Sequence, residues 1–186
     1  MQNETNLPFA ETPNSTPSNE GFTTPNETNN ASAMSGVAES YRQQSSSGAR
    51  WFFWVAALST INSVVLLVAH GSWNFLAGLG ITQLISGFAI GVSEQIGGGG
   101  AVTVVALALD LMVALVFVGL GLFAQKTHTW AFVIGMLIYA LDGLIFIFAQ
   151  EWIAIAFHVF VLYSIYRGLA ANRSLKALQS EGLTPA

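Results

Sequence analysis

The chain has 186 residues, of which 53% are hydrophobic and only 9% are charged. Soluble domains carry about 25% charged residues, so this composition indicates a membrane protein whose first partner is the lipid bilayer. The net charge of −4 gives no basic surface for nucleic acid, and the absence of cysteine excludes disulfides and thiolate chemistry. Three histidines are too few for a metal site without help from carboxylates, and the sequence predicts no metal and no cofactor.

Residues 1–49 form a polar tail that is rich in Asn, Ser, Thr, Glu, Pro and Gln. Such a segment cannot bury enough apolar surface to offset the entropy lost on ordering, so we expect it to be disordered. It contains no apolar core of the kind found in a secretory signal peptide.

Residues 50–172 form the predicted transmembrane domain, because they hold the long apolar runs. A helix needs about 20 mostly apolar residues to cross a bilayer. Four segments satisfy this requirement, at about 51–70, 101–124, 130–149 and 152–170. The last two are separated only by residues 150–151, which predicts an antiparallel hairpin. Residues 173–186 form a short polar extension.

The segment 73–92 is long enough to cross the bilayer, but several glycines and polar residues dilute its hydrophobicity. It is either a fifth span or an interfacial or re-entrant helix. Basic residues favour the cytoplasmic side of short loops. With four spans, all six basic residues fall on one side: Arg42, Arg50, Lys126, Arg167, Arg173 and Lys176. We therefore expect four spans with both termini in the cytoplasm, and five spans as the alternative.

Asp110, Asp142 and His158 stand inside otherwise apolar spans. At a rise of about 1.5 Å per residue, the three lie roughly 10 to 13 Å from the same face, because alternate helices run in opposite directions. Asn62 lies at a similar depth in the first span. Tyr139 precedes Asp142 by one helical turn, which predicts a hydrogen bond between the two side chains. The sequence thus predicts one intramembrane polar layer.

Ionisable groups inside a membrane are costly, so each needs a partner or a polar cavity. The leading hypothesis is a layer that binds a proton, an ion or a small ligand, using Asp110, Asp142, His158, Asn62 and Tyr139. The alternative is a structural or assembly subunit of a larger membrane complex, or a homo-oligomer, in which these groups only join helices.

No catalytic residues are predicted. The Tyr-Asp and Gly-x-Gly-Asp motifs of intramembrane aspartic proteases are missing, and so is the Gly-x-Ser-x-Gly motif of serine hydrolases. The sequence therefore favours a protein that is not an enzyme.

The stretches RWFFWVAALSTINS, residues 50–63, and YALDGL, residues 139–144, resemble those of uncharacterised small multi-spanning bacterial membrane proteins. The resemblance covers about residues 50–170 and implies a location in the bacterial inner membrane. That group has no assigned activity, so the resemblance implies no site residues.

Overall fold

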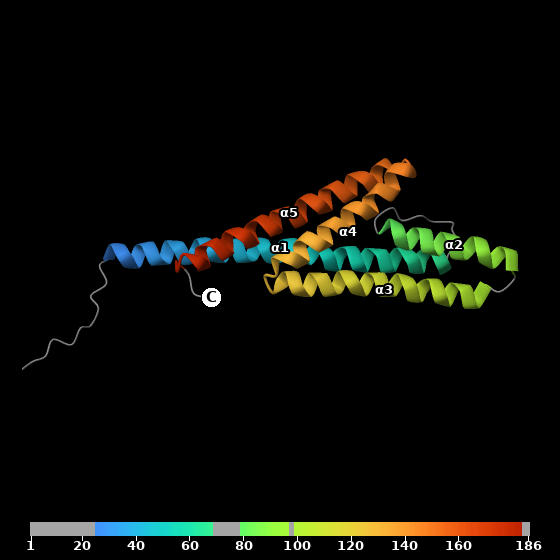
Figure 1. Cartoon of the computed structure of the whole chain (residues 1–186), viewed down its shortest axis with the longest axis horizontal. Helices are drawn as coiled ribbons and strands as arrows, with labels where there is room; N and C mark the ends of the chain where they lie inside the picture. The colour runs from blue at the N-terminus through green and yellow to red at the C-terminus, as the bar shows by residue number, and fades with distance from the viewer. Residues whose placement is uncertain (1–24, 69–78, 97–98, 184–186) are drawn as a thin grey trace, which may run out of the picture.

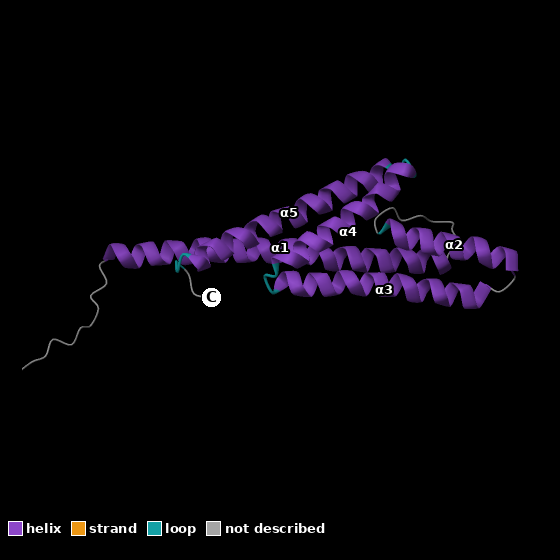
Figure 2. Cartoon of the chain, viewed as in Figure 1, coloured by secondary structure: helices purple, strands orange, loops and turns teal. Residues whose placement is uncertain are grey.

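The computed structural model describes residues 25–68, 79–96 and 99–183. These residues form five helices and no strand (Figures 1 and 2). In chain order the helices are α1 (Pro25–Val68), α2 (Gly80–Ile96), α3 (Gly99–Gln125), α4 (Thr129–Phe148) and α5 (Trp152–Ser180).

Three helices are long and apolar enough to cross a membrane, over Gly100–Gln125, Thr129–Phe148 and Trp152–Ser180. This finding confirms the predicted class of a helical membrane protein for the described residues, and the three candidate spans lie close to three of the predicted ones. The fourth predicted span, residues 51–70, begins within α1, and residues 69–70 lie outside the described part of the chain. Of the segment predicted at 73–92, residues 73–78 lie outside the described part of the chain, and α2 covers Gly80–Ile96.

The structure corrects the prediction of disorder for residues 25–49, which belong to α1. The last residues of this stretch pack against the C-terminal half of α5, a contact that composition alone does not reveal. Ser45 and Ala49 are buried, and Gly48 lies against Gly168 of α5. Membrane helices approach closely at small residues, so this polar stretch packs against α5 even though its composition predicts disorder. Residues 1–24 of the predicted tail lie outside the described residues.

The helices pack around α1, which lies along both α3 and α5 (Figure 1). Helices α4 and α5 form the predicted antiparallel hairpin, and α2 packs on α3. Aromatic side chains fill the centre: the ring of Phe52 lies 6.3 Å from that of Phe117 and 6.2 Å from that of Phe132. Gly135 makes room for this cluster, because a Cβ atom there would overlap the ring of Phe52.

Helix α2 begins inside the bundle and runs in the same direction as α1, whereas α3 runs back (Figure 1). Its first residues contact Ser59 of α1 and Asp142 of α4. Ser59 precedes the end of α1 at Val68 by nine residues, and Asp142 precedes the end of α4 at Phe148 by six. At 1.5 Å per residue these contacts lie roughly 9 to 13 Å from the helix ends. The start of α2 is therefore deep in the bundle.

Candidate functional site

The carboxylate of Asp142 joins three elements of the fold. The backbone N–H of Gly80 donates to Oδ2 at 2.8 Å, and the N–H of Ile81 donates to Oδ1 at 2.9 Å. His158 of α5 places Nε2 at 3.1 Å from Oδ2. Asp142 is 6% exposed and His158 is 2% exposed, so the whole arrangement is shielded from solvent.

The first amides of α2 explain why a carboxylate is placed there. The first turn of a helix has N–H groups without intrahelical partners, and the helix dipole makes that end electropositive. The N–H of Leu79 donates to Ser59 Oγ at 2.7 Å, and the next two donate to Asp142. A residue 62 positions away thus caps α2, where helices normally use a neighbouring side chain. Ser59 and Asp142 together accept hydrogen bonds from three backbone amides that would otherwise have no partner in an apolar core.

Gly80 allows this close approach. A Cβ atom at position 80 would lie 3.0 Å from Cε2 of Phe146 and 3.2 Å from Cβ of Ile145, both on α4. Any larger residue would push the start of α2 away from α4, and with it the two amides from Asp142.

The hydrogen bonds of His158 define where its protons lie. Nδ1 is 2.9 Å from the carbonyl oxygen of Ala154, which can only accept, so Nδ1 carries a proton. Nε2 faces Oδ2 of Asp142. If neither of these two atoms carried a proton, two acceptors would face each other at 3.1 Å. The geometry therefore requires one proton between them, held as an imidazolium beside a carboxylate or as a neutral imidazole beside a carboxylic acid.

Aromatic rings hold the imidazole of His158 in place. The ring of Tyr139 stacks on it, with centroids 4.4 Å apart and planes 11° from parallel, and the ring of Phe146 lies at 4.9 Å. Tyr139, Asp142 and Phe146 are three and four residues apart, so they share one face of α4. Gly143 leaves space for the ring, since a Cβ atom there would lie 3.1 Å from Cδ2 of His158.

Asp110 of α3 makes a separate polar contact farther along α2. The hydroxyl of Ser86 donates to its Oδ2 at 2.6 Å. Ser63 of α1 also faces Asp110. Oδ1 of Asp110 and Oγ of Ser63 are both buried without a hydrogen-bond partner among the described residues. Two buried carboxylates therefore contact α2, one at its first turn and one about six residues later.

The predicted polar layer is thus divided into two separate groups of contacts, one around Asp142 and one around Asp110. Asp142 and His158 meet directly, but Asp110 is bonded to Ser86 rather than to either of them. The predicted hydrogen bond between Tyr139 and Asp142 is wrong for the described part of the chain, where the Tyr139 hydroxyl has no partner and the ring stacks on His158 instead. Asn62 is buried at 3% exposure, and no described contact links it to the aspartates.

The backbone amides of residues 79–81 are the groups that sequence reasoning missed. Every residue but proline has a backbone amide, so these groups carry no composition signal. The nearest clue was the dilution of segment 73–92 by glycine and polar residues, which marked it as unlike the other apolar runs.

No family model, curated protein or solved structure matches this chain. Within the described ranges there is no group of three or more His, Cys, Asp or Glu side chains that could hold a metal ion. The arrangement can hold one proton between Oδ2 of Asp142 and Nε2 of His158, next to the N-terminus of a helix.

Proposed function

We propose that this chain is a proton-binding membrane protein in which the Asp142–His158 pair is the proton site and α2 is the element that responds to it. The observation that carries the proposal is the triple contact of Asp142. One carboxylate accepts hydrogen bonds from two amides of α2 and faces the imidazole of α5. A change in its charge therefore alters its interactions with both helices.

The charge of the pair changes with its proton. With one proton between Oδ2 and Nε2 the pair is neutral overall, which suits a site shielded from water. Without that proton the site carries one net negative charge in an apolar core, and ionised groups are expensive there unless they are paired. Proton loss therefore favours separation of Asp142 from His158 or entry of water, and either change loosens the packing around the start of α2.

The titratable groups around the pair come from α4 and α5. Tyr139 stacks on His158, while α1 and α2 contribute the Ser59 hydroxyl and backbone amides. Asp110 binds Ser86 and is a second buried carboxylate in contact with α2.

In this proposal the chain crosses the membrane four times, through the second part of α1 and through α3, α4 and α5. Helix α2 is re-entrant, because it starts within the bundle and runs parallel to α1. The segregation of all six basic residues to one side supports cytoplasmic termini.

The test uses ¹⁵N nuclear magnetic resonance of the full chain in lipid bilayers, labelled at histidine. The His158 signal is assigned from its loss in His158→Gln. We expect Nε2 of His158 to show the signature of a proton shared with Oδ2 of Asp142, and this signature should be lost in Asp142→Asn.

A His158 spectrum that is the same in the wild type and in Asp142→Asn would overturn the proposal. The pair would then serve only to join α2, α4 and α5, as in the structural alternative. His128, which is exposed, provides an internal reference for a histidine in contact with water.

A further inference from the structure

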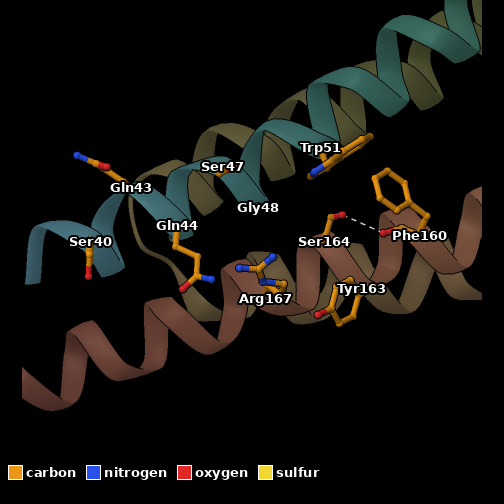
Figure 3. A pocket seen from close by; sticks show the side chains of 10 residues that line it. All are labelled: Ser40, Gln43, Gln44, Ser47, Gly48, Trp51, Phe160, Tyr163, Ser164 and Arg167. Carbon is orange, nitrogen blue, oxygen red and sulfur yellow. Dashed lines mark hydrogen bonds between the residues drawn. The ribbon is translucent and has the colours of Figure 1, made fainter. Parts of the chain in front are cut away.

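A second feature lies far from the proton site, in a cleft between α1 and α5 (Figure 3). Its volume is about 680 Å³, and six residues of α1 and four of α5 line it. The two helices touch at Gly48 and Gly168, where a Cβ atom on Gly48 would lie 2.5 Å from the Cα of Gly168. This backbone contact fixes the spacing of the two helices, so Ser47 of α1 and Arg167 of α5 border the same space.

The lining has the chemistry of an anion site. It contains one cation, Arg167, together with hydroxyl and amide side chains, and it contains no carboxylate. The guanidinium of Arg167 lies between the helices on the side of Gln44 (Figure 3). Across the residues that the structure describes, neither Arg167 nor Gln44 has an ion-pair or hydrogen-bond partner, whereas the Ser164 hydroxyl donates to the carbonyl of Phe160. Arg167 is therefore a cation with unused donors facing amides and hydroxyls.

Positive charge is also concentrated on the neighbouring surface of α1. An adjoining groove shares Gln43 and Ser47 with the cleft and is lined by Arg42, Arg50 and Glu39. The local balance is three basic residues against one acidic residue. Such a surface attracts anions and repels cations.

The other half of the cleft is aromatic and faces the bilayer. Trp51 and Phe160 pack edge to face with centroids 5.2 Å apart, and Tyr163 is 59% exposed beside them. Trp51 begins the apolar part of α1, and Arg167 lies near the end of the apolar part of α5. Tryptophan and tyrosine prefer the headgroup level of a membrane, and arginine near a helix end extends toward it. The cleft thus has a polar half toward water and an aromatic half toward hydrocarbon.

We propose that this cleft holds the phosphate-bearing headgroup of an anionic lipid. Arg167 binds the phosphate, Gln44 and Ser47 donate hydrogen bonds to it, and the aromatic wall of Trp51 and Phe160 lies against the start of the acyl chains. A lipid fits better than a free phosphate because half of the lining is apolar and open to the bilayer. The proposal does not depend on the proton site.

The test measures lipid binding to the purified full chain in detergent micelles by native mass spectrometry. The probes are dioleoyl phosphatidylglycerol and dioleoyl phosphatidylcholine, which share acyl chains and differ in headgroup charge. We expect a first phosphatidylglycerol that binds more tightly than phosphatidylcholine. Arg167→Gln should weaken it about fivefold, the effect of one basic group near an anionic surface.

Arg173→Gln is the matched control, because it removes the same charge from the same helix outside the cleft. It should leave the first phosphatidylglycerol bound, and Arg167→Lys should retain most of the preference. Circular dichroism checks that each variant keeps its helices.

Three results would overturn the proposal: equal binding of the two lipids, equal losses in Arg167→Gln and Arg173→Gln, or displacement of phosphatidylglycerol by inorganic phosphate at matched concentration. The last result would assign the cleft to a soluble phosphate.

Discussion

At the residue scale, Asp142 matters because both of its oxygens are used. An asparagine there keeps one oxygen acceptor but turns an NH₂ group toward groups that need an acceptor. We expect Asp142→Asn to leave one amide of α2 unpaired and to reduce the free energy of unfolding by about 1 to 3 kcal/mol. Unfolding in mixed micelles, followed by tryptophan fluorescence, measures the loss, and hydrogen exchange at Gly80 and Ile81 locates it.

Asp110→Asn is the control for this prediction. The oxygen of the new amide can still accept from the Ser86 hydroxyl, so the loss of stability should be smaller and exchange at residues 80 and 81 should be unchanged. Equal losses in the two variants would show that Asp142 has no special role at the start of α2.

Gly143 tests the position of the His158 ring without removing any polar group. Alanine at this position places a methyl group 3.1 Å from Cδ2 of His158, tighter than ordinary packing. The ring must shift away from Asp142, so we expect a loss of about 1 to 3 kcal/mol in stability and a changed His158 ¹⁵N spectrum.

Gly119→Ala in α3 is the matched variant, because nothing lies within 4 Å of its new methyl group. It should be neutral or slightly stabilising, since alanine favours helix more than glycine does. A wild-type His158 spectrum in Gly143→Ala would contradict the prediction, because it would show that the methyl group fits without moving the ring.

At the element scale, we expect the contact between α1 and α5 to stabilise the N-terminal part of α1. Gly48→Ala places a methyl group against the backbone of Gly168, which cannot rotate away. We expect α1 and α5 to separate and the N-terminal part of α1 to lose helix. The loss should appear as lower helicity by circular dichroism and as faster hydrogen exchange in residues 40–48.

Gly36→Ala provides the control in the same helix, because its methyl group meets nothing within 4 Å. It should preserve or raise the helicity. Equal behaviour of the two variants would show that the N-terminal part of α1 is helical without α5.

The sequence predicts best the helices whose length and apolar composition are set by the thickness of the bilayer. A span needs a long apolar run, so α3, α4 and the first part of α5 lie close to their predicted ranges. The contact between Asp142 and His158 follows from equal depth on adjacent antiparallel helices. By contrast, the start of α2 depends on Ser59 and Asp142, which lie 20 and 62 positions away from their amides. Gly48 likewise packs against Gly168 of α5, so local composition cannot reveal either contact.

At the scale of the whole molecule, the direction of α2 determines the topology. Helices α1 and α2 run the same way, and the N-terminal part of α1, the turn between α3 and α4 and the C-terminal part of α5 lie toward one end (Figure 1). If α2 were a fifth span, the turn between α3 and α4 would lie on the opposite side from residue 43. The two arrangements therefore assign residues to opposite sides of the membrane.

Cysteine accessibility in sealed vesicles separates these arrangements, because the chain has no cysteine of its own. Gln43→Cys, Gln95→Cys, His128→Cys and Gln150→Cys place single thiols at exposed positions. With four spans, a membrane-impermeant maleimide should reach positions 43 and 128 from one side and positions 95 and 150 from the other. With five spans, positions 43, 95 and 150 would share a side and position 128 would stand alone. That second pattern would exclude a re-entrant α2, because its two ends would then have to lie on opposite faces of the membrane.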